Sequence, residues 1–189
     1  MGVISVKIGT MEYFVADNIA VPHCFTTRTG GVSTGIFDSL NLSQNRGDPT
    51  ENVVENFRRI GAVLGFTPDD VVNARQIHSD IVVRVDEKNR GNLDVTGASP
   101  VCDALITNVP GVVLAGFYAD CQLILLYDEK NHAVGAVHAG WRGTVAGIAP
   151  KGVAKMVEDY GCDPADILAA IGPGISACHF SSSSAMPCG

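Results

Sequence analysis

The sequence predicts a mixed α+β fold, and three observations lead to this prediction. Short apolar runs of strand length follow one another between residues 71 and 137. One amphipathic helix is expected over residues 48–64, and a second one is expected over residues 144–160. Apolar runs of four to eight residues between turn signals are typical of buried strands. We therefore expect packed β-sheets flanked by helices.

The N-terminal part of the chain is expected to form strands. Residues 3–8 and 11–15 are two such segments on either side of Gly9, so they predict a hairpin. A third strand is expected over residues 23–27. The polar, glycine-rich segment 28–35 that follows is expected to be a loop without regular structure.

The first helix has the clearest sequence pattern. Asp48 is a good N-cap residue, Pro49 suits the first helical position, and Glu51 completes a capping-box pattern. Gly65 supplies the left-handed stop at the other end. Apolar residues recur at helical spacing and predict one face that packs on a core: Val53, Phe57, Ile60 and Leu64.

The rest of the chain is expected to consist of strands, one loop and a second helix. The polar segment 87–100 reads as the loop. The second helix contains Pro150, which removes a backbone donor, so we expect a kink or a restart there. The expected strands cover residues 71–77, 81–85, 104–107, 112–118, 122–127, 132–137 and 167–171.

Length and composition indicate one globular domain. The chain has 189 residues, of which 46% are hydrophobic and 17% charged. We assign the domain to residues 1–180, and we expect the serine-rich segment 181–189 to be a disordered or foreign tail. The net charge of −7 disfavours non-specific binding to nucleic acid or to anionic membranes.

The same sequence indicates a cytoplasmic protein. It contains no apolar stretch long enough to span a bilayer, and its N-terminus has no signal-peptide pattern. The six cysteines lie far apart, so they are expected to be thiols rather than a disulfide framework. The sequence does not predict an oligomeric state.

Three residues of metal-ligand type each lie just past a short apolar run: His78, Cys121 and His138. Residues at strand ends can converge from distant parts of a sequence. Two imidazoles and one thiolate bind zinc and leave its fourth position for water or substrate. The gaps of 43 and 17 residues match no short zinc motif, so spacing alone also allows three unrelated structural residues.

Several sequence blocks together resemble the laccase-domain family, whose members are described as multicopper polyphenol oxidases and as purine nucleoside phosphorylases. The blocks occur in the expected order between residues 23 and 178. They are Thr27-Arg28-Thr29-Gly30-Gly31-Val32-Ser33, Ser39-Leu40-Asn41-Leu42, Gly47-Asp48-Pro49, Gln76-Ile77-His78-Ser79, Asp103-Ala104-Leu105-Ile106-Thr107, Ala119-Asp120-Cys121, His138-Ala139-Gly140-Trp141-Arg142-Gly143-Thr144 and Gly172-Pro173-Gly174-Ile175.

The resemblance carries expectations about fold and site. It implies a layered α/β/β/α architecture with mixed, largely antiparallel sheets. It also implies that His78, Cys121 and His138 bind zinc at the active site. Family chains continue well beyond the Gly-Pro-Gly-Ile block, so this chain is expected to be truncated at its C-terminus.

The resemblance further implies a zinc-dependent purine nucleoside enzyme. Such an enzyme would catalyse phosphorolysis of adenosine, inosine or methylthioadenosine, or deamination of adenosine, so its partners are a small nucleoside and phosphate. Arg28 and Arg142 are candidates for phosphate binding, because a guanidinium can grip two oxygens. Asn41 is a candidate for contacting the nucleoside. A structural ion pair for each arginine, and a turn-stabilising role for Asn41, are equally good interpretations.

Three other interpretations of the site stay open. Two histidines and a cysteine also suit copper, which would support oxidation of phenols. However, the chain has five histidines, too few for the additional trinuclear cluster of a conventional multicopper oxidase. Cys121 could instead be the nucleophile of a cysteine hydrolase with His138 as its base. The chain could also be an inactive metal-binding remnant.

A serine-hydrolase motif is a weaker alternative. Residues 31–35 match the G-x-S-x-G nucleophile elbow around Ser33. That elbow requires an apolar strand before the serine and a helix after it, and neither is expected here. The sequence therefore disfavours this interpretation.

Overall fold

The structure is a computed structural model of the chain, and it describes residues 2–44, 46–91, 93 and 99–176. The serine-rich segment 181–189, expected to be a tail, lies outside these residues. The described strands are β1 (Val3–Ile8), β2 (Met11–Ala16), β3 (Phe25–Thr26), β4 (Val71–Asn73), β5 (Val82–Arg84), β6 (Ala104–Thr107), β7 (Val113–Ala115), β8 (Gln122–Asp128), β9 (Ala133–Ala139) and β10 (Leu168–Ile171).

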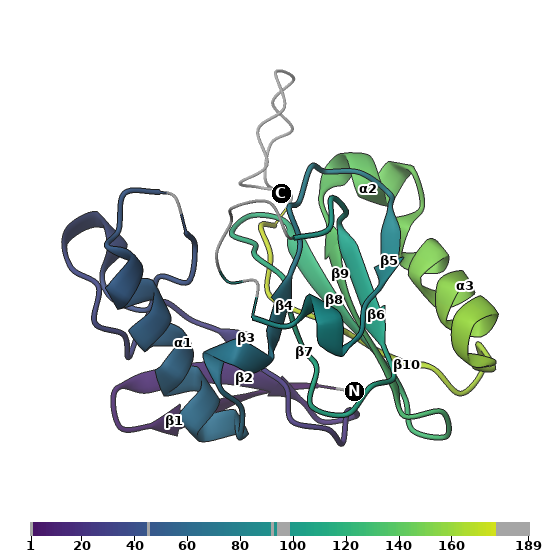
Figure 1. Cartoon of the computed structure of the whole chain (residues 1–189), viewed down its shortest axis with the longest axis horizontal. Coiled ribbons are helices and arrows are strands. Elements are labelled where there is room, and N and C mark those ends of the chain that lie inside the picture. The colour runs from purple at the N-terminus through teal and green to yellow at the C-terminus, as the bar shows by residue number, and fades with distance from the viewer. Residues whose placement is uncertain (1, 45, 92, 94–98, 177–189) are drawn as a thin grey trace.

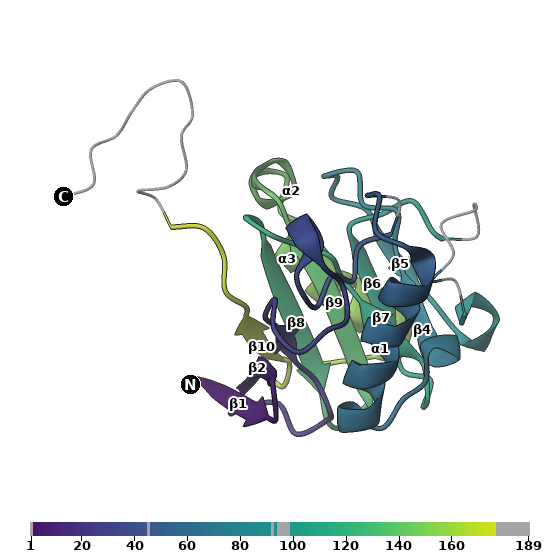
Figure 2. The same ribbon diagram turned by 90° about the vertical axis from the view of Figure 1, so that its left-hand side faces the viewer.

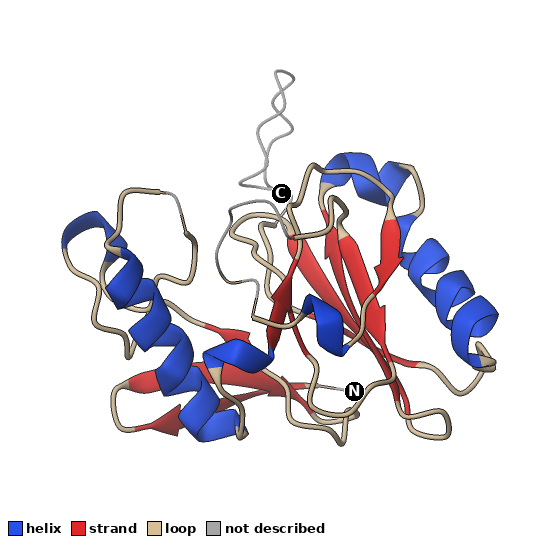
Figure 3. Cartoon of the chain, in the orientation of Figure 1, coloured by secondary structure: helices blue, strands red, loops and turns tan. Residues whose placement is uncertain are grey.

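Helices are fewer than strands, as Figure 3 shows. The α-helices are α1 (Thr50–Leu64), α2 (Trp141–Val145) and α3 (Ile148–Tyr160). Short 3₁₀ helices are η1 (Gly35–Phe37), η2 (Pro68–Asp70) and η3 (Glu87–Asn89). The predicted mixed α+β fold is confirmed. None of the helices in the described part of the chain has the length and apolar character that crossing a bilayer requires.

The strands form three sheets. The largest has five strands in the order β10-β8-β9-β6-β5, and all its pairs are antiparallel except β5 with β6. A three-stranded antiparallel sheet has the order β1-β2-β3, and β4 pairs with β7 in parallel. The sheets are therefore mixed and mainly antiparallel, as expected.

The elements stack as four layers. In Figure 1, α3 covers one face of the five-stranded sheet, and the two smaller sheets lie between its other face and α1. Figure 2 gives the view from the α1 side, with α3 behind the sheet. Buried clusters fill each gap between layers: Leu126, Val137 and Met156 lie under α3, Phe25, Leu123 and Tyr127 between the sheets, and Val53, Phe57 and Val71 under α1.

The strand residues alternate between these clusters because successive side chains of a strand point to opposite faces. On β8, Leu123 and Tyr127 pack toward β3, while Leu126 packs toward α3. On β6, Leu105 faces β4 and β7, while Ile106 faces α3. The central strands β6, β8 and β9 are thus largely buried on both sides, which explains why they read as nearly continuous apolar runs.

Helix α1 confirms the predicted apolar face but not the predicted cap. Val53, Phe57 and Ile60 are buried, and Gly65 ends the helix at φ 84°. The N-cap is Pro49, and no side chain caps the helix. Asp48 was the expected cap, and that prediction was wrong because its carboxylate accepts hydrogen bonds from the side chains of Ser33, Asn41 and Asn52.

The second helix is divided in two, as the proline predicted, although the break comes before it. Helix α2 starts at Trp141, three residues earlier than expected, and ends before Gly147, which has a φ of 80°. Pro150 then lies in the first turn of α3. Backbone N–H groups in the first turn have no intrahelical acceptor, so the proline breaks no helical hydrogen bond there.

Several strands are shorter than predicted. The expected strand 23–27 is reduced to Phe25–Thr26, and 112–118 is reduced to Val113–Ala115. The expected strand 71–77 ends at Asn73. Beyond it Arg75 forms an isolated bridge with Val101, and the backbone amides of residues 77–79 donate to the carboxylate of Asp103, which places His78 in a loop.

Candidate metal centre

The structure brings His78, Cys121 and His138 together. One ligand atom of each residue lies within 4.8 Å of the others, and this is the one such group of His, Cys, Asp and Glu side chains found among the described residues. His138 belongs to β9, Cys121 directly precedes β8, and Leu123 of β8 pairs with His138. The antiparallel register of β8 and β9 therefore carries two of the three residues to one end of the sheet.

Asp103 organises both histidines. Its carboxylate Oδ1 accepts a hydrogen bond from Nδ1 of His138 at 2.9 Å. The same carboxylate accepts the backbone N–H groups of Ile77, His78 and Ser79 at 2.6–3.2 Å. Burial would raise the pKa of Asp103, but hydrogen bonds from Ser79 and His138 hold it below its usual value. The ionised carboxylate thus orients one imidazole and holds the backbone of the other.

The backbone at His78 adopts a conformation that residues other than glycine rarely take. Its φ is 59°, in the left-handed region. Three successive amides around one carboxylate supply the compensating interactions, since aligned backbone N–H groups form a favourable site for an anion. The position of the His78 ring therefore depends on Asp103.

Gly140 provides the space for this ring. A Cβ atom at position 140 would lie 2.6 Å from Nδ1 of His78 and 3.5 Å from Sγ of Cys121. Helix α2 begins immediately after Gly140, so the chain passes directly beside the three ligands. A residue with a side chain at this position would displace the His78 ring.

The thiol of Cys121 has a pKa above its usual value. Burial raises its pKa, and the negative charges of Asp120 and Asp103 add to the effect. A catalytic cysteine usually has a lowered pKa, from a nearby positive charge or a helix N-terminus. The surroundings of Cys121 therefore favour a thiol that ionises on binding a metal over a free nucleophile.

The donor set fits a metal ion. Because Nδ1 of His138 is bonded to Asp103, Nε2 is the ring atom left for a cation, and this carboxylate–histidine pairing is typical of metal sites. His138 is 4% exposed, whereas His78 is exposed and Cys121 is half-buried, so the centre opens to solvent on one side. Three protein ligands with an open side are the arrangement of catalytic rather than structural zinc sites.

A cavity of about 800 Å³ lies next to these residues. Its wall includes Ala119 and Asp120, which precede Cys121, and the segment 173–175. The three ligands are not among the residues that line it. Four aromatic residues do line it: Phe14, Phe37, Phe117 and Tyr118.

The structure places the three predicted substrate-binding residues differently. Arg28 and Asn41 both line the cavity. Nε and Nη2 of Arg28 donate to the carbonyl oxygen of Asp38 at 3.0 and 2.6 Å. The amide of Asn41 binds Ser43 and Asp48, so its observed contacts stabilise a turn.

Arg142 is not among the residues that line this cavity. It belongs to α2, close to Gly140 in the chain, and its guanidinium lies 5.3 Å from the ring centre of Trp141. Both residues are exposed. Arg142 therefore lies close in sequence to His138, one of the candidate metal ligands.

Asp103 and Gly140 are the site residues that sequence reasoning missed. Asp103 begins the apolar block 103–107, and an acidic residue that opens a buried strand is a signal that could have indicated its role. Gly140 lies between two predicted elements, where a glycine gives no specific signal. Only the approach of its backbone to His78 shows why it matters.

Comparisons with known proteins identify relatives along most of the chain. The profile of the family described as "Multi-copper polyphenol oxidoreductase laccase" matches residues 22–187. A purine nucleoside phosphorylase of Deinococcus radiodurans is 44% identical over 160 residues, 85% of this chain and 59% of its own length. Another, from Corynebacterium glutamicum, is 38% identical over 169 residues, 89% of this chain and 67% of its own length.

A solved structure confirms the fold. The crystal structure of YlmD from Geobacillus stearothermophilus superposes with a TM-score of 0.85 at 35% sequence identity. The match covers 95% of this chain and 68% of that one, so the chain spans roughly two thirds or less of these relatives. With the family profile matched over most of its length, the chain belongs to the multi-copper polyphenol oxidoreductase laccase family.

Proposed function

We propose that the chain is a zinc-dependent purine nucleoside enzyme that performs phosphorolysis of adenosine, inosine or methylthioadenosine. The observation that carries the proposal is the cluster of His78, Cys121 and His138 within 4.8 Å, next to a cavity large enough for a nucleoside. The purine nucleoside phosphorylases among its relatives support the choice of substrate.

We assign zinc rather than the copper of a multicopper oxidase to this donor set. Two imidazoles and one thiolate leave a cation with a net charge near +1, and when bound such an ion supplies positive charge and Lewis acidity beside the substrate. A conventional multicopper oxidase needs a second, histidine-rich cluster. His23 is engaged by Ala16 and Val21, and the described residues contain one candidate metal group.

The residues of the chain then have separate tasks. The aromatic side chains of the cavity offer flat apolar faces to a purine ring. Arg28 binds phosphate through the guanidinium edge that Asp38 does not occupy, and Asp103 holds both histidines in place. In the reaction, a phosphate oxygen bonds to C1′ as the bond from C1′ to the base breaks, and the base leaves with the electron pair and takes up a proton.

A direct experiment tests this proposal. The protein is purified without added metal, its zinc and copper are quantified, and it is incubated with adenosine in the presence and absence of phosphate. Phosphorolysis predicts adenine and ribose 1-phosphate, formed only with phosphate. Inosine formed without phosphate would show deamination instead, and zinc-loaded protein that yields neither product would identify a metal-binding remnant.

Arg28→Ala tests the phosphate site. We expect the KM for phosphate to rise about tenfold or more, since a charge-assisted bidentate contact is lost. Arg58→Ala is the matched control, because Arg58 is an exposed arginine that pairs with Glu55 on α1. An unchanged KM in Arg28→Ala would move the phosphate site elsewhere, with Arg142 as the next residue to test.

One feature of the geometry favours a second candidate, a cysteine hydrolase. Asp103 is hydrogen-bonded to His138, and a ring nitrogen of His138 lies within 4.8 Å of Sγ of Cys121, so the three could serve as orienting acid, base and nucleophile. The raised pKa of Cys121 and the presence of His78 beside it argue against this assignment. Thiol labelling separates the two candidates, because a metal ligand is protected in the zinc-loaded protein, whereas an activated nucleophile reacts rapidly.

A further inference from the structure

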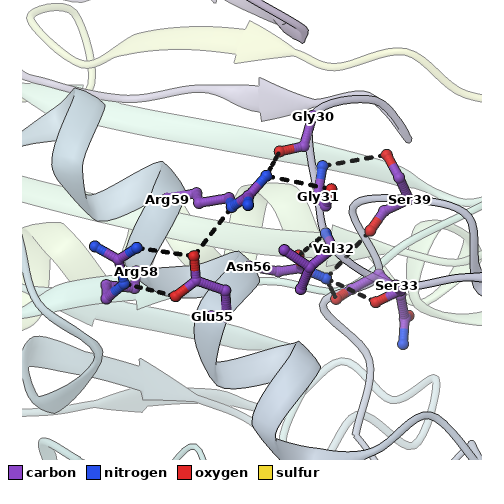
Figure 4. Close-up of polar contacts among 10 residues, drawn as sticks. Gly30, Gly31, Val32, Ser33, Ser39, Glu55, Asn56, Arg58 and Arg59 are labelled. Carbon is purple, nitrogen blue, oxygen red and sulfur yellow. Dashed lines mark hydrogen bonds and ion pairs between the residues drawn. The ribbon is translucent and has the colours of Figure 1, made fainter.

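Asn56 connects helix α1 to the loop that forms one wall of the cavity. Its side chain is completely buried, with 0% exposure, in the middle of a helix whose other buried side chains are mainly apolar. Oδ1 accepts the backbone N–H of Val32 at 2.9 Å. Nδ2 donates to the carbonyl oxygen of Asn41 at 2.7 Å and to Oγ of Ser33 at 2.9 Å. Figure 4 shows how this amide lies against the loop.

These contacts belong to a closed set of hydrogen bonds. Ser33 donates to Oδ2 of Asp48 at 2.6 Å, and the same oxygen accepts from Nδ2 of Asn41 at 2.8 Å. The carbonyl oxygen of Asn41 accepts from Nδ2 of Asn56, which closes the set. The loop has little regular structure, so its buried polar groups need side-chain partners. Asn56 provides them from a rigid helix.

The two halves of the loop are packed tightly. A Cβ atom at Gly31 would collide with the carbonyl oxygen of Ser39 and with Leu40. Ser39 and Leu40 both donate their backbone N–H to the carbonyl oxygen of Arg28 at 2.9 Å. A shift of residues 31–33 would therefore be passed to Arg28 and to residues 40–43, all of which line the cavity.

An asparagine at this position lowers the stability of the protein unless its side-chain amide makes hydrogen bonds. Burial of an amide without hydrogen bonds is unfavourable, and asparagine is a weaker helix former than leucine. Helix packing alone would be served by an apolar residue, as at Val53, Phe57 and Ile60 of the same helix. The amide is instead satisfied by the cavity loop.

We propose that Asn56 is a positioning residue that fixes the loop of residues 31–43, of which residues 36–38 and 40–43 line the cavity, and thereby sets the affinity of the cavity for the nucleoside. The inference rests on the proposed function, because it takes this cavity as the nucleoside site. Asn56 acts through the loop, with no contact to the metal centre among its hydrogen bonds. Metal binding and nucleoside binding are therefore separable.

The test compares Asn56→Ala with Arg58→Ala, a substitution two residues away on the exposed side of α1. Adenosine binding to the zinc-loaded proteins is measured by calorimetry, and amide hydrogen exchange is measured in parallel. In Asn56→Ala we expect adenosine affinity to fall at least about tenfold, with zinc content unchanged. The amides of Val32, Ser39 and Leu40 should exchange faster, while those of Ile77, His78 and Ser79 keep their rates. Arg58→Ala should match the unmodified chain.

Ser39→Ala keeps the inference testable if Asn56→Ala does not fold. Oγ of Ser39 accepts from the N–H of Gly31 and donates to the carbonyl of Arg28 without filling the core. The Ser39→Ala substitution should also reduce adenosine affinity, but by a smaller factor than Asn56→Ala. If the loop amides exchange faster while adenosine affinity is unchanged in both variants, the inference is overturned. Unchanged exchange of the loop amides would also overturn it. If the unmodified zinc-loaded chain binds no adenosine, the proposed function itself fails.

Discussion

Asp103, which directly precedes β6, and His138 of β9 form a buried hydrogen bond of 2.9 Å between Oδ1 and Nδ1. The exposed fractions of the two side chains are 0% and 4%. The same carboxylate binds three backbone amides around His78, so one residue fixes two of the three candidate ligands. This arrangement makes the candidate metal centre sensitive to a residue that does not itself belong to the set of candidate ligands.

Asp103→Asn should weaken zinc binding by about ten- to a hundredfold, the usual cost of losing a partner that orients a ligand. The amide nitrogen of asparagine cannot accept the N–H groups that the carboxylate accepts. Asp128→Asn is the matched control, since Asp128 is an equally buried carboxylate that holds the turn between β8 and β9. Zinc competition with a chromophoric chelator gives the affinities. Equal affinities in both variants would remove Asp103 from the metal centre.

Cys121→Ala should abolish stoichiometric zinc binding and, with it, phosphorolysis. Two imidazoles alone are a weak zinc site, and the thiolate supplies the negative charge that reduces the cation's charge to near +1. Cys24→Ala should retain its zinc, because Cys24 lies on a different part of the chain from the ligand group. Elemental analysis of both purified variants decides the matter, and full zinc occupancy in Cys121→Ala would refute the proposed ligand set.

Gly140→Ala should lower zinc affinity about tenfold or more, because the new methyl group displaces the His78 ring from its position. Gly2→Ala serves as the control, since a Cβ there would meet only Asp17, at an ordinary 3.4 Å. The melting temperature of the zinc-free proteins should change little in either variant. A Gly140→Ala protein with unmodified affinity would show that His78 does not ligate the metal in this position.

Asp128 should make stability depend on pH in the acid range. Burial would raise its pKa, but hydrogen bonds from Cys162, Asn131 and backbone amides hold it below the usual value. A lowered folded pKa gives stability above about pH 4, the pKa in the unfolded chain, which is lost as the pH falls through the folded pKa.

Asp128→Asn should therefore destabilise the protein at pH 7 by about 1–3 kcal/mol, the usual range for hydrogen bonds to a buried charge. The difference from the unmodified chain should shrink as the pH falls below about 4. Denaturant unfolding at several pH values measures it. A difference that stays constant down to pH 2 would mean that ionisation of Asp128 contributes nothing.

Local sequence patterns predicted the elements well where one physical signal dominates. The apolar stripe of α1 was correct because helical spacing and burial agree at Val53, Phe57 and Ile60. The cap was wrong because Asp48 has better partners in a loop that precedes it by many residues. An interruption of the second helix was foreseen at Pro150, but the structure has it earlier, at Gly147 with its left-handed conformation.

The sequence by itself determined the mixed fold, the family resemblance and the three residues able to bind a metal, because periodicity and residue chemistry are local properties of the chain. Tertiary structure alone decided that these residues meet, since their separation of 43 and 17 positions is closed by the register of β8 with β9 and by the loop around Asp103. It also decided that Gly140 must lack a side chain and that Asn56 holds the cavity wall. Such contacts join segments far apart in sequence, and no local pattern records them.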